Sequence, residues 1–234
     1  MLERRWDVAG AEFRKAVELS PASLDVYLDY APYLAIMGRP DESRAALLKA
    51  KALDPLSVVA AHALAISFLV YKDYDGAIAE FKRAIALNPN WTWGSIKLGV
   101  AFTHKGMCRD ALEAATIAED ALRHGDTPLA RAWLGYIYGI CGLKGRAQDA
   151  LRQLAKWPAS IREDPLKEAT VYAGLRDKER VHRLLEQAGE REGGNSLMLV
   201  SFPRLFWPDL EREPAFRRII ERVGLPLKLL SPDP

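Results

Sequence analysis

The chain has 234 residues, and its 33 Lys and Arg residues nearly balance its 31 Asp and Glu residues, which leaves a formal net charge of +2. This balance supplies no long-range field toward nucleic acid or an anionic membrane surface, so we expect contact with neither. No run approaches the roughly 18 uninterrupted apolar residues of a membrane span. The N-terminus leads into an amphipathic segment and not into a signal-peptide core. Together these features predict a soluble, cytoplasmic protein.

A repeat governs most of the sequence, since Pro21, Pro55 and Pro89 stand 34 residues apart. A large apolar residue comes eight positions ahead of each proline and an alanine comes five ahead, namely Phe13, Leu47 and Phe81, and Ala16, Ala50 and Ala84. A period of 34 is the length of a unit of two antiparallel helices, and such units stack into a solenoid. The sequence therefore predicts an all-α fold without one central core.

The units that start at 24, 58 and 92 each begin three residues after a proline, and the later units follow after a two-residue displacement. This frame predicts the second helix of an incomplete repeat over 1–23, repeats over 24–57 and 58–91, a repeat with a loop insertion over 92–127, a repeat over 128–161, a degenerate repeat over 162–190, and a C-terminal cap with a short helix over 191–234. The repeat over 162–190 is degenerate because Glu168 occupies a normally apolar slot and Val181 a normally small one.

The N-terminal segment fits only the second helix of a unit, because Trp6, Ala9 and Phe13 keep the register while no first helix precedes them. Such a helix exposes the face on which its partner would lie, whereas terminal repeats normally carry a polar outer face. Three explanations stay open. The native polypeptide extends upstream, a second copy of the chain covers that face in a homodimer, or a small exposed patch is tolerated.

The unit over 58–91 illustrates the expected packing. Its helices, near Ser57–Tyr71 and Asp75–Leu87, each carry apolar residues at spacings of three and four, which makes one apolar stripe per helix. Facing stripes of this kind pack as an antiparallel hairpin. Pro89 then ends the second helix, because the residue before a proline is pushed out of the helical region.

Glycine is favoured at the turn between paired helices, because the first helix can then end in a left-handed residue without steric cost. Gly38 and Gly106 stand at this position in two of the units. Lys72 is the exception, and the Asp73 that follows it predicts a polar turn with its own helix cap.

The motifs of these units resemble the tetratricopeptide repeat over about 1–189. The best matches are Leu98-Gly99 with Phe102, Gly106 and Ala111, and the run Leu134-Gly135-Tyr136-Ile137-Tyr138. The resemblance implies a right-handed superhelical solenoid of antiparallel helix pairs that serves as a protein-binding scaffold and not as an enzyme.

The C-terminal part is similar to the C-terminal repeat regions of bacterial multidomain regulators, on the residues Pro203–Phe206 and Glu213–Ile220. This resemblance implies the regulatory or sensory arm of a larger bacterial signalling or transcription-regulating protein. The apolar run 197–202 must be covered. Either it folds back on the last repeat as a cap, or it is a docking strand for a partner.

The chain carries no motif for catalysis, for a cofactor or for a metal. Its four histidines lack HExxH spacing, and GxGxxG, GxxxxGK[ST] and GxSxG are absent. Cys108 and Cys141 are too few for a disulfide framework or a four-ligand zinc site. We expect two buried, inert thiols. A pair between them stays open, because they fall at nearby ends of successive units, although a cytosolic setting argues against it.

The tetratricopeptide resemblance further implies that the first helix of each unit lines a concave groove. A clamp for an acidic tail is not expected, since Pro32, Ile66 and Val100 stand where Asn would be needed. The groove instead suits an apolar or amphipathic peptide, with Trp93, Trp133 and Tyr136 as anchors. The candidate groove residues are His62, Ile66, Leu69, Trp93, Ile96, Lys97, Val100, His104, Trp133, Tyr136 and Ile140.

Two alternatives to this groove stay open. Several of its side chains could instead pack on neighbouring helices or on the C-terminal cap. The groove could also hold a small ligand, so that the chain would be a sensor module coupled to an output domain.

Overall fold

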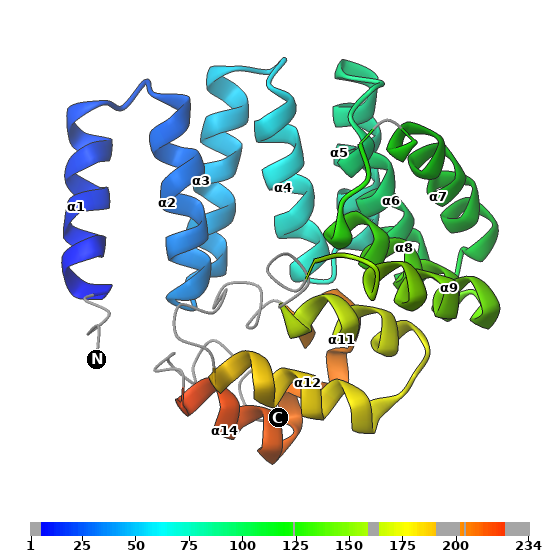
Figure 1. The fold of residues 1–234 in the computed structure, drawn as a ribbon. Coiled ribbons are helices and arrows are strands. Elements are labelled where there is room, and N and C mark those ends of the chain that lie inside the picture. The colour runs from blue at the N-terminus through cyan, green and yellow to red at the C-terminus, as the bar shows by residue number, and fades with distance from the viewer. Residues whose placement is uncertain (1–5, 124, 159–163, 191–201, 204, 223–234) are drawn as a thin grey trace.

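The computed structural model describes residues 6–123, 125–158, 164–190, 202–203 and 205–222. Over these residues the chain is all-helical, and successive helices pack as antiparallel pairs, which confirms the predicted fold class (Figure 1). The helices are α1 (Trp6–Leu19), α2 (Leu24–Ile36), α3 (Pro40–Leu53), α4 (Val58–Val70), α5 (Tyr74–Leu87), α6 (Thr92–His104), α7 (Cys108–Leu122), α8 (Pro128–Ile140), α9 (Lys144–Leu154), α11 (Pro165–Gly174), α12 (Lys178–Glu190), the 3-10 helix η1 (Pro208–Arg212) and α14 (Pro214–Arg222).

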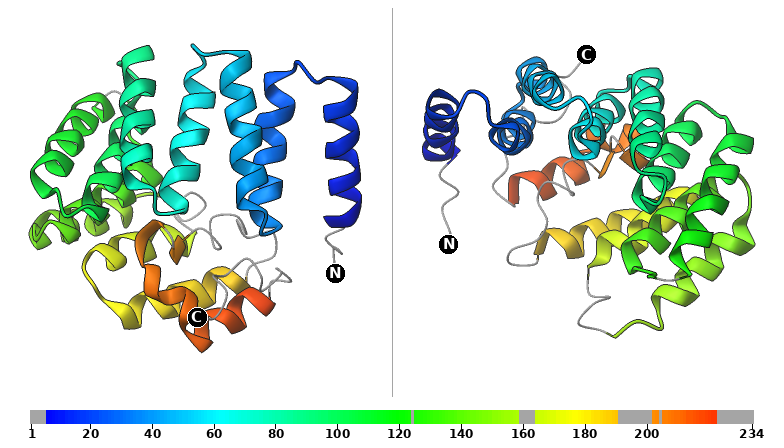
Figure 2. Two further views of the ribbon diagram at one scale, coloured as in Figure 1. Left: turned by 180° about the vertical axis from the view of Figure 1, so that it is seen from behind. Right: turned by 90° about the horizontal axis from the view of Figure 1, so that it is seen from above.

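The pairs follow one another along a curved row, and α14 lies on the side toward which the row bends (Figure 2). The concave side is therefore shared between the first helices of the pairs and the C-terminal segment. We call the described residues 202–203 and 205–222 the C-terminal cap. None of the described helices is long and apolar enough to cross a membrane.

The turns inside the pairs follow the predicted chemistry. Gly38, Gly106 and Gly142 have positive φ angles of 68°, 69° and 80°. Lys72 takes the same left-handed conformation with a φ of 65°. The Asp73 carboxylate accepts a hydrogen bond of 3.0 Å from the amide of Gly76, which confirms the predicted cap at the start of α5. A side-chain cap therefore accompanies the one turn of these four that lacks glycine.

Small residues set the distance between helices. In α5 the side chains of Ala77, Phe81 and Ala84 are fully buried, as their spacing predicts. α8 and α11 approach each other closely, since a Cβ atom added to Gly174 would lie 2.5 Å from the carbonyl oxygen of Tyr136. The Tyr136 carbonyl is part of the backbone of α8, so no flexible side chain could move aside to make room for the added Cβ atom. Glycine is thus required at this contact.

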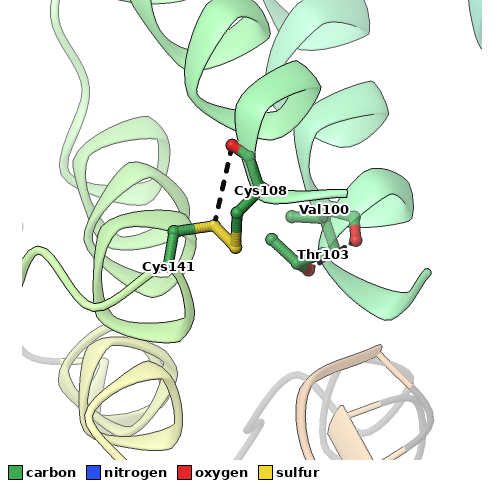
Figure 3. The surroundings of a disulfide bond; sticks show 4 residues. All are labelled: Val100, Thr103, Cys108 and Cys141. Atoms are coloured by element: carbon green, nitrogen blue, oxygen red, sulfur yellow. Dashed lines mark hydrogen bonds between the residues drawn. A yellow bond between two sulfur atoms is a disulfide. The ribbon is translucent and has the colours of Figure 1, made fainter. Parts of the chain in front are cut away.

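The two cysteines correct an expectation from the sequence. Cys108 begins α7, Cys141 follows the last residue of α8, and the two form a disulfide bond with their Cα atoms 5.4 Å apart (Figure 3). The prediction of two inert thiols is therefore wrong. The stacking of consecutive units brings the start of one second helix beside the end of the next first helix, which composition alone could not reveal.

Substitution of Gly174 by Ala tests the close approach of α8 and α11. We expect a loss of about 1–3 kcal/mol in the free energy of unfolding, because overpacking forces backbone shifts. Gly145→Ala in α9 is the matched control, since a Cβ atom there meets nothing within 4 Å. Urea denaturation measures both. Equal midpoints for Gly174→Ala and the wild type would contradict the observed contact.

Reduction of the disulfide tests the link between α7 and α8. The bond spans a sequence separation of 33 residues. Because it restricts the unfolded chain, reduction with dithiothreitol should lower the free energy of unfolding by about 2–4 kcal/mol. Thermal denaturation measures the loss, and the Cys108→Ser/Cys141→Ser double variant should show no further effect of the reductant. Two titratable thiols in the denatured, unreduced wild type would contradict the bond.

Candidate functional site

The C-terminal cap covers the part of the concave side that α6 and α8 form. The Phe206 ring meets the rings of Trp133 and Tyr136 edge-on, with centroid distances of 4.9 Å in both cases. Phe202 lies 5.2 Å from Phe206, and both phenylalanines are fully buried. Burying each such ring contributes roughly 1.5–3 kcal/mol. Aromatic packing therefore holds the cap on this surface.

Polar contacts fix the position of the cap. His104 Nε2 lies 2.7 Å from the carbonyl oxygen of Leu205. Burial lowers the pKa of His104, so the neutral ring donates its Nε2 proton to that carbonyl. On α12, Lys178 Nζ and His182 Nε2 lie 2.9 Å and 2.6 Å from the Glu213 carboxylate. The cap is thus attached to α6, α8 and α12.

The predicted groove residues divide into three groups. Leu69, Ile96 and Val100 are fully buried between helices. Trp133 and Tyr136 are 4% and 2% exposed and lie beneath Phe206, so their role as peptide anchors stays a prediction. The residues that remain partly exposed are His62, Ile66, Trp93, Lys97, His104 and Ile140.

An apolar pocket of about 200 Å³ opens between α2 and α4. We call it the α2–α4 pocket. Alanine and proline side chains of α2 form one wall, and His62, Ile66 and Ser67 of α4 belong to the other. The complete lining is Ala31, Pro32, Ala35, Ser43, Leu47, His62, Ala63, Ile66, Ser67, Val70 and Tyr71.

The repeat itself explains why the pocket opens between these two helices. Ala35 of α2 corresponds, 34 residues later, to Leu69 of α4, which is fully buried. Ala63 of α4 corresponds in the same way to Lys97 of α6. Short side chains thus stand between α2 and α4 where the next pair of units has long ones. Sequence reasoning named His62 and Ile66 but missed Ala35 and Ser67. The alignment of successive units shows that Ala35 is short, but it does not show which positions lie opposite it.

A half-buried lysine adjoins the pocket. Lys97 Nζ lies 2.5 Å from Nε2 of His62, which lines the pocket, and 5.7 Å from the ring centroids of Trp93 and Trp133. Burial, aided by the charge of Lys97, lowers the pKa of His62 to about 3. Burial also lowers the pKa of Lys97 to about 8. At neutral pH the ammonium therefore donates to a neutral imidazole, and the pocket wall itself carries no charge.

Other chemistry finds no support in the part of the chain that the structure describes. Within these residues no group of three or more His, Cys, Asp or Glu side chains could hold a metal ion. The α2–α4 pocket contains no acidic residue and no nucleophile paired with a base. Its lining suits the binding of an apolar group.

Comparison with known proteins identifies the fold. No protein-family model matches the chain. Tetratricopeptide repeat protein 13 of Homo sapiens is 28% identical over 108 residues, which are 46% of this chain and only 12% of that protein. This chain thus spans a small part of that relative's length.

Solved structures extend the likeness to nearly the whole chain. A structure of MamA superposes with a TM-score of 0.54 and 23% identity, over 65% of this chain and 92% of that one. A chain of the APC/C hetero-tetramer Cut9-Hcn1 superposes with a TM-score of 0.59 and 17% identity, over 94% of this chain and 43% of that one. The fold is therefore a tetratricopeptide-like solenoid.

Proposed function

We propose that this chain binds proteins by holding an apolar or amphipathic peptide on its concave side, next to the C-terminal cap. The observation that carries this proposal is the α2–α4 pocket, which is apolar and has a volume of about 200 Å³. Pockets of this kind, which bury one anchor side chain, supply most of the affinity of many protein interfaces.

The surroundings of the pocket favour an amphipathic ligand over a wholly apolar one. Ile66 continues the apolar surface, and Trp93 lies beyond it as a partly exposed aromatic ring. Lys97 contacts His62 of the lining and lies 5.7 Å from the Trp93 ring centroid, which places a cation next to the pocket. A peptide helix with one apolar face would lay that face over Ile66 and Trp93 and keep its polar face in solvent.

The biological role that we propose is the regulatory or sensory arm of a larger bacterial signalling or transcription-regulating protein. It rests on the similarity of Pro203–Phe206 and Glu213–Ile220 to the C-terminal repeat regions of such regulators. An effector domain encoded in the reading frame upstream of Met1 would support this role. Association of two chains through α1 is a separate proposal, and light scattering that shows a monomer over a wide concentration range would remove it.

A small-ligand sensor is the second candidate function, and the size of the α2–α4 pocket favours it. A cavity of about 150 Å³ is already enough to bind benzene, so about 200 Å³ accommodates a small aromatic molecule. A mass shift of the purified protein under native conditions would support a sensor, whereas a bound polypeptide would support the scaffold.

Peptides selected from a random display library on the immobilised full chain test the scaffold function. We expect Ile66→Lys to raise the Kd of the selected peptides at least tenfold, because it places a charge in the apolar surface. Ile117→Lys on α7 is the matched control, since Ile117 is 55% exposed and away from the pocket lining. The Kd of the selected peptides for Ile117→Lys should stay within twofold of their Kd for the wild type. Fluorescence anisotropy measures the Kd values, and circular dichroism verifies that both variants fold.

Two results would contradict the scaffold function. Selection that enriches no binding peptide would remove it. If Ile66→Lys and Ile117→Lys weakened peptide binding equally, or if neither variant weakened it, peptide binding would lie outside the concave side.

A further inference from the structure

We propose that Lys97 pairs with an acidic side chain of the bound peptide, on the concave side between the α2–α4 pocket and the C-terminal cap. This inference rests on the peptide-binding function proposed above and specifies the charge that the peptide carries. It follows from the place of Lys97 in the repeat, from the contacts of its ammonium group, and from a comparison with the other half-buried lysines.

The repeat places Lys97 on the concave side. It stands 34 residues after Ala63, which lines the α2–α4 pocket, and 36 residues before Trp133, which Phe206 of the cap covers. Because the second interval includes the two-residue displacement, these residues occupy the same position in successive first helices. Lys97 itself is partly exposed, so a ligand on the concave side can reach its side chain.

The ammonium group of Lys97 has donors to spare. Its Nζ lies 2.5 Å from Nε2 of His62 and 5.7 Å from the ring centroids of Trp93 and Trp133. An ammonium group has three protons to donate, and His62 accepts one of them. An aromatic ring attracts a cation within about 6 Å of its centroid, so both rings lie near the outer limit of that range. Among the described residues, two donors of Lys97 therefore remain for an acceptor.

The comparable lysines of the chain pair with carboxylates. Within the described ranges the half-buried lysines are Lys51, Lys97 and Lys167. The Nζ atom of Lys51 lies 2.5 Å from the carboxylate of Glu80. That of Lys167 lies 4.0 Å from the carboxylate of Asp164. No carboxylate of the described residues lies within 4.0 Å of the Nζ atom of Lys97, so its charge is left without a counter-charge.

Charge complementarity selects an acidic partner for this site. A half-buried charge without a counter-charge is costly, because it has lost part of its hydration. Burial accordingly lowers the pKa of Lys97 to about 8. His62 offers only a neutral ring at neutral pH, because its pKa lies at about 3. A carboxylate from another molecule would supply the missing negative charge, whereas a basic side chain would be repelled.

The carboxylate belongs to a side chain within the peptide and not to its C-terminus. A clamp on a terminal carboxylate would need further polar donors on the neighbouring first helices, and Ile66 and Val100 supply none. A single ammonium group flanked by Trp93 and Trp133 instead suits one carboxylate at the border of an apolar surface. An amphipathic helix carries Asp or Glu at such a border, next to the apolar residues that it lays over Ile66.

A double-mutant cycle on the peptides selected for the scaffold test measures this pairing. Each peptide is synthesised with an amidated C-terminus, and its Asp and Glu residues are replaced one at a time by Asn and Gln. We expect one of these replacements to raise the Kd for the wild-type chain about tenfold, because a half-buried ion pair lies in strength between exposed pairs and buried ones. Lys97→Met, which keeps the length of the side chain and removes its charge, should raise the Kd of the parent peptide by a similar factor.

The combination of the two changes decides between a charge pair and a structural role of Lys97. The neutral peptide should bind Lys97→Met no more weakly than it binds the wild type, because the pair is already broken. Lys49→Met is the matched control, since Lys49 is an exposed lysine of α3 outside the pocket lining, and it should leave each Kd within twofold. Fluorescence anisotropy measures the Kd values, and circular dichroism verifies that both variants fold.

The outcomes separate this inference from the function on which it rests. If Lys97→Met weakened the parent and the neutral peptide by the same factor, the pairing would be overturned. Peptides that depend on Ile66 but keep their affinity when every Asp and Glu is neutralised would leave the scaffold function intact and overturn this inference alone. Binding lost on amidation of the C-terminus would overturn the assignment to a side chain. If selection enriched no peptide, the scaffold function and this inference would fall together.

Discussion

The close approach of paired helices through small residues is the constraint on which the rest of this structure depends. Ala50, Ala84 and Ala118 recur late in the second helices, and each is fully buried. Because these side chains are short, each second helix presses against its neighbours, and the row of pairs bends in a regular way. The bend creates a concave side. The size of the side chains that face this side decides whether space remains there for another molecule. Where the residues facing it are large, the protein fills the space itself.

The two ends of the concave side illustrate this rule. Around α8, Trp133 and Tyr136 present aromatic faces that Phe206 covers. Between α2 and α4, Ala35 and Ala63 leave a pocket. The surface around α8 is therefore covered by the chain's own Phe206, whereas the α2–α4 pocket has room for a group from another molecule. The cap and the pocket are two solutions to the same packing problem.

The sequence predicted what the period determines and missed what depends on contacts between units. The turn at Lys72 and its cap at Asp73 were predictable, because turn chemistry is local. The pairing of Cys108 with Cys141 was left open, because it depends on how consecutive units stack. The open pocket at Ala35 was missed, because a short side chain signals a cavity only when the positions opposite it are known. The covering of Trp133 by Phe206 was an alternative that spacing could not decide.

The contact between His104 and Leu205 joins residues 101 positions apart. This contact and the disulfide link helices of the later units to one another. Local unfolding of one of these helices would therefore break contacts with several neighbours. Among the described residues, the most extensive contacts of α1, α2 and α3 are with neighbouring helices of the row. In a linear array of this kind, local opening begins where the fewest interfaces must be broken. The α2–α4 pocket lies in that less protected part, so a molecule seated there would bridge two units and suppress fraying of the N-terminal end. We therefore expect amide hydrogen exchange to be fastest toward the N-terminal end of the described helices and slowest beneath the cap.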